Sequence, residues 1–317
     1  MINQYIQKLI SNLPEKHLNT KNPQKLDLIF DGGLFNGSYL VGVALFLKKM
    51  EKLNYITVER ISGTSIGSFI SLLYISDNLE LFESIYDTMI NHIKADYSFD
   101  KYDIVFDKLR ETLPLNIHKQ MSKRVFINYY NIKKCEKIVK STYKSIDDVF
   151  NTIRKSSFIP FVINGNILYK NKYIDGINPY IFPDVLTSTE KKALFVDLRS
   201  MRKTMDCINV KNEKSNFHRI LSGVLDVHSF FIKDSNTEMC SYVNNWSSID
   251  YINFHYFKGS FEKMIVYSIY YFVLWREKYK NNKYFKDIFL SEQNILYKIF
   301  VKIIRDIYII LLDSYFI

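Results

Sequence analysis

The sequence lacks the cysteine patterns of metal sites and disulfide frameworks. Its 317 residues include three cysteines, Cys135, Cys207 and Cys240, which are odd in number and far apart. None belongs to a C-x-x-C pair, so neither a zinc site nor a set of disulfides is predicted. A reducing, intracellular setting is therefore expected.

Long apolar runs are also missing. No stretch without a charged residue is longer than 61–76, which has 16 residues, and 264–275 is shorter. A helix needs about 20 apolar residues to span a bilayer. The first 18 residues have no signal-peptide core. The chain is expected to be soluble or peripherally membrane-associated, and not secreted.

The positive charge has no matching nucleic-acid motif. The formal net charge is +10, which favours anionic partners such as a phospholipid surface or a nucleic acid. The lysines are scattered rather than gathered in one segment, which favours a compositional origin. Nucleic-acid binding is therefore the least favoured interpretation.

What the sequence does contain is an alternation of apolar runs and helical periods. A buried strand is predicted at 26–30, a helix at 37–52, a second strand at 57–62 and a helix at 66–75. This order is typical of a parallel sheet covered by helices. Further predicted elements are a helical region at 77–120, a strand at 124–132, a helix at 146–156 and a strand at 192–200.

The pentapeptide Gly63-Thr64-Ser65-Ile66-Gly67 stands between the second strand and the second helix. A serine on a sharp strand-to-helix turn needs glycine two places before and after it, because a Cβ at either place would clash. The positive end of the helix dipole would favour negative charge at the serine oxygen. Ser65 is therefore a candidate nucleophile.

A glycine loop, Asp31 to Gly42, follows the first strand. Backbone N–H groups in such a loop suit an oxyanion hole or a phosphate. Gly32 and Gly37 have the G-x-x-x-x-G spacing, but Ser38 stands where a phosphate-binding loop has lysine. A nucleotide site is therefore not expected.

A third feature is Asp175, which follows a short apolar run and precedes Gly176. A carboxylate there could serve as the base for a serine. The ordinary pKa of aspartate, about 3.9, is poorly matched to this role. Burial in an apolar pocket would raise the pKa and improve the match.

Together these features resemble the patatin-like phospholipases. The glycine loop, the G-T-S-I-G turn, an R-x-S-S-x-I-P segment and Y-I-D-G occur in the order and spacing of that family, over residues 25 to about 200. The R-x-S-S-x-I-P segment comprises Arg154, Ser156, Ser157, Ile159 and Pro160.

The resemblance implies a three-layer α/β/α fold with a mainly parallel central sheet, plus a helical C-terminal region. It also implies a catalytic dyad in which Ser65 forms an acyl-enzyme and Asp175 is the general base. The N–H groups of Gly32, Gly33 and Leu34 would form the oxyanion hole. The substrate would be a glycerolipid or phospholipid at a membrane surface, and no metal or organic cofactor would be required.

The corresponding domain organisation is a polar lead-in at 1–24, a catalytic domain at 25–204 and a helical region at 205–317. The last region would pack on the domain or face a membrane. Its apolar part, 294–317, is interrupted by charged residues.

Three positions depart from the family. Where the pattern is D-G-G-G-x-[RK]-G, this chain has Leu34 for the third glycine and Asn36 for the basic residue. Ile177 takes the third place of D-G-[GA]. Because a misdirected oxyanion donor costs roughly 10²–10³ in rate, a catalytically silent lipid-binding or interaction protein on the same fold is the alternative.

A histidine-based triad is the other option for a serine hydrolase. His218, His228 and His255 follow Ser65 and Asp175 in the order of the α/β-hydrolases. That fold normally forms several strands before its serine turn, whereas two are predicted here. The histidines are interpreted as bystanders.

Overall fold

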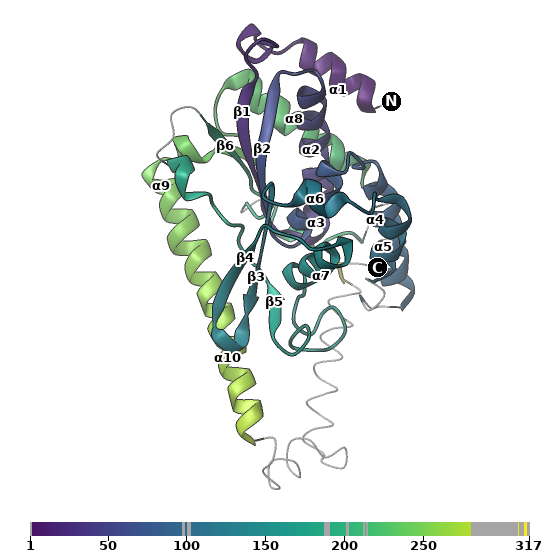
Figure 1. Cartoon of the computed structure of the whole chain (residues 1–317), viewed down its shortest axis with the longest axis vertical. Helices are drawn as coiled ribbons and strands as arrows, with labels where there is room; N and C mark the ends of the chain where they lie inside the picture. The colour runs from purple at the N-terminus through teal and green to yellow at the C-terminus, as the bar shows by residue number, and fades with distance from the viewer. Residues whose placement is uncertain are drawn as a thin grey trace.

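The structure, a computed structural model, describes residues 2–96, 99, 103–186, 191–200, 203–211, 213, 215–279, 310, 314 and 315. Over these residues it is an α/β protein with a mixed, mostly parallel sheet and a long C-terminal helix (Figure 1). The predicted α/β class is thereby confirmed.

The first half of the sheet follows the predicted strand and helix order. Strand β1 (Gln24–Phe30) leads through the 3₁₀ turn η2 (Leu34–Asn36) into helix α2 (Gly37–Lys52). Strand β2 (Ile56–Gly63) leads directly into α3 (Ile66–Ile75). Strand β1 has five consecutive buried residues at its C-terminal end, as expected for a strand covered on both faces.

The helical region predicted at 77–120 contains three helices: α4 (Leu81–Asp96), α5 (Asp103–Thr112) and α6 (Ile117–Met121). Strand β3 (Val125–Asn131) follows, then β4 (Glu136–Lys140) and α7 (Ile146–Ser156). The Ser145 side chain accepts the Asp148 N–H and caps α7. The Asp148 carboxylate accepts the Lys144 N–H.

Two further strands complete the sheet. The strand order is β4-β3-β2-β1-β6-β7, where β6 is Lys192–Val196 and β7 is Cys240–Tyr242. The pairs β3–β2, β2–β1 and β1–β6 are parallel. The outer strands β4 and β7 run antiparallel to their neighbours. The short strand β5 (Tyr173–Asp175) pairs antiparallel with β3.

Alternate side chains of the central strands enter different cores. Leu26, Leu28 and Phe30 of β1 pack with the side chains of α2, α3 and α8 (Phe217–Lys233). Ile29, between them, packs on the other face with residues of the 178–186 link and of the turn at 243–245. In Figure 1, α2, α3 and α8 lie on one side of the sheet, and α9 (Ser248–Ile252) and α10 (Gly259–Tyr279) lie on the other.

The connections between the strands cover both faces of the sheet. The connections from β1 to β2 and from β2 to β3 move along the sheet in one direction, and right-handed crossovers place both on one face. The connection from β5 to β6 lies over the other face. It carries Tyr180, Phe182 and Val185 over that face as an irregular segment and a 3₁₀ turn.

Residues 2–11 form a helix, α1, where the sequence analysis expected only a polar lead-in. Its Ile6 and Ile10 belong to the main core and are at most 1% exposed. One turn of helix separates these two side chains, so a segment that is polar on average still has an apolar face. Helix α1 packs against α2 and α8.

Within the region expected to be helical from 205 onward, the described residues contain α8, α9, α10 and the π-helical turn η8 (Asn253–Lys258). Strand β7 was not predicted there. Helix α8 packs along α2. The apolar stretch 294–317 lies outside the described residues except for 310, 314 and 315. Among the residues that can be placed, no helix combines the length and the apolar character needed to cross a membrane.

Candidate active site

Ser65 occupies a strained turn between β2 and α3. Its backbone φ of 52° and ψ of −127° lie outside the regions that residues other than glycine usually adopt. A Cβ on Gly63 would lie 2.6 Å from the Gly67 carbonyl oxygen, and a Cβ on Gly67 would lie 2.5 Å from that of Phe30. The steric requirement for glycine on both sides of Ser65 is therefore present in the fold.

Strand pairing brings Asp175 to this turn. Strand β2 pairs with β3 up to Gly63 opposite Ile127. Strand β5 pairs with β3 from Tyr173 to Asp175, which lies opposite Tyr129. Strand β4 occupies the other edge of these β3 residues, so β2 and β5 share one edge. Because β2 is parallel to β3 and β5 is antiparallel, their C-terminal ends face each other.

Ser156 ties the two strand ends together. Its carbonyl oxygen accepts the N–H of Ser65 at 3.1 Å and the N–H of Gly176 at 3.3 Å. Its hydroxyl donates to the Asn128 carbonyl at 2.8 Å, and Asn128 Nδ2 donates to the Gly176 carbonyl at 3.1 Å. From the sequence, Ser156 is recognisable only as part of a motif. The structure shows that it links the serine turn to the aspartate turn.

The two carboxyl oxygens of Asp175 have different surroundings. Its Oδ1 accepts the Ile177 N–H at 2.6 Å. Its Oδ2 is buried and has no hydrogen-bond partner in the described part of the chain. Burial raises the pKa of Asp175 to about 6, although the Ile177 N–H, the neighbouring Ser65 hydroxyl and the Arg199 guanidinium all act to lower it. The raised pKa is the shift that the sequence analysis expected from burial.

The glycine loop presents two N–H groups that have no other acceptor. Gly32 N–H donates to the Asp31 carboxylate at 2.9 Å. In the described structure, the N–H groups of Gly33 and Leu34 donate to no group of the chain. Of the three predicted oxyanion donors, Gly32 is thus already engaged, whereas Gly33 and Leu34 remain available.

Two of the departures from the family fall at left-handed backbone positions. Leu34 has φ 47° and Ile177 has φ 59°. Glycine adopts such angles freely, and an L-residue pays about 1–2 kcal/mol. Leu34 and Ile177 therefore adopt a backbone conformation that favours glycine, at an energetic cost.

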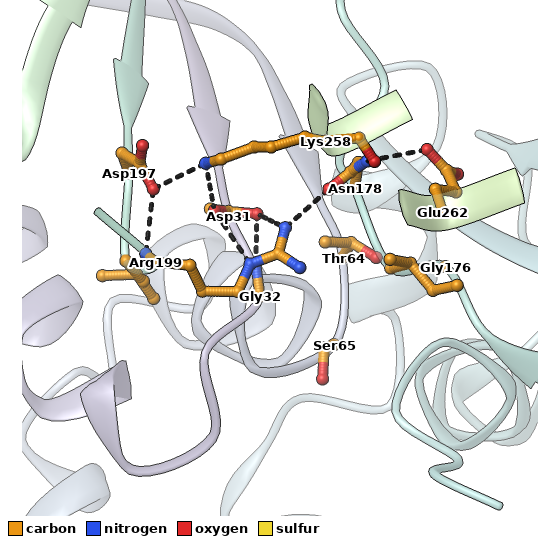
Figure 2. Close-up of polar contacts among 12 residues, drawn as sticks. Asp31, Gly32, Thr64, Ser65, Gly176, Asn178, Asp197, Arg199, Lys258 and Glu262 are labelled. Atoms are coloured by element: carbon orange, nitrogen blue, oxygen red, sulfur yellow. Dashed lines mark hydrogen bonds and ion pairs between the residues drawn. The ribbon is translucent and has the colours of Figure 1, made fainter. Parts of the chain in front are cut away.

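An ion-pair group surrounds the buried Asp31, the first residue of the glycine loop (Figure 2). Arg199 Nη2 donates to Asp31 at 2.6 Å and to Asn178 Oδ1 at 2.7 Å. Lys258 Nζ lies 3.4 Å from Asp31 and 2.8 Å from Asp197. Burial alone would raise the pKa of Asp31, but Arg199 and Lys258 hold it below its ordinary value. In Figure 2 the Ser65 side chain points away from this group.

None of these ion-pair residues was predicted except Asp31, as part of the loop. Arg199 and Asp197 follow β6, which neighbours β1, so their chain position after an adjacent parallel strand was a usable signal. Lys258 comes from η8, and nothing in its local sequence indicates that it reaches the loop.

An apolar cavity opens beside Ser65. It has a volume of about 110 Å³ and is open to solvent. Its walls come from the glycine loop, α3, α4, α5 and the segment after α7. The lining residues are Leu34, Phe35, Ser65, Ile66, Phe69, Phe82, Ile85, Tyr86, Met89, Phe99, Val105, Ser157, Ile159 and Ile163.

Among the described residues, no histidine lines the cavity. His228 on α8 instead packs on the Phe46 ring, with centroids 6.1 Å apart. Burial lowers the pKa of His228 and of His255. Over the residues that the structure describes, no three or more His, Cys, Asp or Glu side chains gather as a metal-binding group.

The fold and the position of Ser65 on a turn between a parallel strand and a helix are typical of serine hydrolases. Residues 28–179 match the family model described as patatin-like phospholipase. No curated protein matches the chain. The chain therefore contains a patatin-like phospholipase domain, and proteins of this family are typically serine hydrolases that act on lipid acyl esters.

Proposed function

We propose that the protein hydrolyses acyl esters of glycerolipids or phospholipids at a membrane surface, with Ser65 as nucleophile and Asp175 as general base. One observation carries the proposal: a buried carboxylate lies beside the hydroxyl of a serine on a strained turn, at the wall of an apolar cavity. The family match over residues 28–179 supports the substrate class.

In the proposed first step, the Ser65 hydroxyl attacks the ester carbonyl and its proton passes to Asp175. The tetrahedral oxyanion would accept hydrogen bonds from Gly33 and Leu34, the loop N–H groups that have no other acceptor. The Ser65 N–H cannot contribute, since it donates to Ser156. Collapse expels the alcohol, which takes the proton from Asp175 and leaves the acyl group on Ser65.

In the second step, Asp175 takes a proton from water, which attacks the acyl-enzyme and releases the fatty acid. An Asp175 pKa of about 6 leaves the group mainly ionised at neutral pH. It also makes the carboxylate a stronger base than an exposed aspartate. The apolar cavity would hold the acyl chain.

The test is fatty-acid release from mixed phospholipid vesicles by the wild type, Ser65→Ala and Asp175→Asn. We expect activity in the wild type and a loss of about 10²-fold or more in both variants. Ser76→Ala, at the far end of α3, and Asp148→Asn, on α7, are matched controls that should keep their activity.

A wild type that releases no fatty acid from phospholipid, lysolipid or triacylglycerol would contradict the proposal. Vesicle binding by that inactive protein would favour the alternative, a silent lipid-binding protein on the same fold. Full activity in Ser65→Ala would show that another group is the nucleophile.

A further inference from the structure

Arg219 is a charged side chain in the protein core. It lies on α8, is 2% exposed and is among the largest fully buried side chains of the described chain. Arginine is almost never fully buried unless its charge and its donors are satisfied. Its partners therefore show what holds the guanidinium in place.

All five N–H donors of the Arg219 guanidinium have an acceptor. Nε donates to Glu213 at 2.7 Å, and Nη2 donates to Glu213 at 2.5 Å and to the Asn209 carbonyl at 2.7 Å. Nη1 donates to the Asp206 carbonyl at 2.6 Å and to Asn36 Oδ1 at 2.8 Å. The last of these contacts reaches the glycine loop.

Asn36 is fixed at both ends of its side-chain amide. Its Nδ2 donates to the carbonyls of Leu198 at 2.7 Å and Lys203 at 2.8 Å. Its Oδ1 receives Arg219. The Asn36 backbone N–H in turn donates to the Gly33 carbonyl at 2.9 Å.

This last bond sets the direction of one oxyanion donor. The Gly33 carbonyl and the Leu34 N–H belong to one planar trans peptide, so they point in opposite directions. Because Asn36 holds the carbonyl within the turn η2, the Leu34 N–H must point away from that turn. Any rotation of this peptide would therefore break the bond to Asn36.

Helix α8 is itself held close to α2. A Cβ on Gly42 of α2 would lie 2.0 Å from the Ile220 carbonyl oxygen, and a Cβ on Gly223 of α8 would lie 2.0 Å from the Tyr39 carbonyl oxygen. The two helices thus approach each other backbone to backbone at Ile220 and Gly223, close to Arg219 in the chain. The helix that carries Arg219 is therefore held in a fixed position relative to α2.

We propose that Arg219 is a positioning residue for the oxyanion loop, acting through Asn36 on the Gly33–Leu34 peptide. Asn36 stands where the family pattern has a basic residue, and the cation at this place comes instead from α8. The proposal rests on the proposed function, because it assigns a role to the loop in hydrolysis.

The test compares Arg219→Gln with Arg60→Met. Arg60 bonds the fully buried Asp27 and lies in the sheet, away from the loop, so both variants lose a buried ion pair. Steady-state kinetics on a short monomeric ester, the affinity for a trifluoromethyl ketone analogue of that ester, and the melting temperature are measured for both.

We expect both variants to melt at a lower temperature. Only Arg219→Gln should lose kcat, by roughly 10²-fold, with KM unchanged and with a matching loss of affinity for the ketone. Equal kinetics in Arg219→Gln and the wild type would overturn the proposal, and so would equal losses of kcat in Arg219→Gln and Arg60→Met. If Arg219→Gln does not fold, Arg219→Lys takes its place: it keeps the charge beside Glu213 but lacks the planar fork.

Amide hydrogen exchange at Asn36, whose N–H donates to the Gly33 carbonyl, gives a readout that does not depend on activity. It should accelerate in the Arg219 variant and stay at the wild-type rate in Arg60→Met. A wild type that hydrolyses no ester would refute the proposed function, while the exchange rates would still decide whether Arg219 holds the loop. Unchanged exchange in the Arg219 variant would refute that role.

Discussion

Replacing Asp175 by asparagine should make the protein more stable while it removes the proposed base. Burial raises the pKa of Asp175 from 3.8 to about 6, so the folded state holds the ionised form less well than the unfolded chain does. At about 1.4 kcal/mol for each unit of pKa, the penalty at neutral pH amounts to about 3 kcal/mol. Asparagine has the same shape, keeps an acceptor for the Ile177 N–H and carries no charge.

The direction of the pKa shift determines the pH range in which Asp175→Asn changes the stability. Between 3.8 and about 6 the folded protein retains a proton that the unfolded chain loses, so wild-type stability falls as the pH rises through this window. Below 3.8 both states are protonated, and Asp175→Asn should match the wild type. Above about pH 6 the variant should be more stable by the full amount, about 3 kcal/mol.

Urea unfolding of the wild type and Asp175→Asn at pH 4, 5, 6 and 7.5 measures this difference. Asp148→Asn is a control of opposite sign. Burial acts to raise the pKa of Asp148, but the bond from Lys140 and the Lys144 N–H hold it below its ordinary value, so its removal should destabilise the protein at neutral pH. A stability difference for Asp175→Asn that is independent of pH, or a loss of stability at pH 7.5, would refute the reasoning.

Three further predictions concern the same fold and site. The kcat/KM for ester hydrolysis should rise with pH and reach half its plateau near pH 6, because Asp175 must be ionised to accept a proton; a pH–rate profile that is flat from pH 5 to 8 would contradict this. Gly223→Ala should lower the free energy of unfolding by about 1–3 kcal/mol, since its Cβ would meet the Tyr39 carbonyl. In contrast, Gly259→Ala, whose Cβ would have no neighbour closer than 3.7 Å, should raise the free energy of unfolding by up to about 1 kcal/mol. Equal denaturation midpoints for the two glycine variants would contradict this prediction. Met89→Trp should narrow the cavity and lower kcat/KM for long-chain esters relative to short-chain esters by roughly tenfold, and an unchanged ratio would show that the acyl chain lies elsewhere.

The sequence allowed the first half of the sheet to be predicted because each element there has a strong local signal. The predicted helices at 37–52 and 66–75 coincide with α2 and α3. Both begin beside glycine-containing turns, and α2 also has a regular apolar period. Strand β7 had no such signal, because it has three residues and exists through its pairing with β6.

The candidate site could be predicted only where its residues lie in short motifs. Ser65 and Asp175 stand in recognisable turns, and the pairing of β2 and β5 with one edge of β3 brings those turns together. Arg219 is separated from Asn36 by 183 residues. A single arginine in an amphipathic helix resembles a solvent-exposed residue, so its burial follows only from the approach of α8 to α2.

The ion pairs of Asp31 limit how far the chain can be truncated from its C-terminal end. The family match ends at residue 179, but Asp31 within it is fully buried and neutralised by Arg199 and Lys258, both beyond that point. A fragment that stopped at 179 would leave this carboxylate without a counter-charge and β1 without its neighbour β6. The smallest unit able to fold by itself should therefore extend at least through η8, and expression of nested C-terminal truncations should show soluble protein only when Lys258 is included.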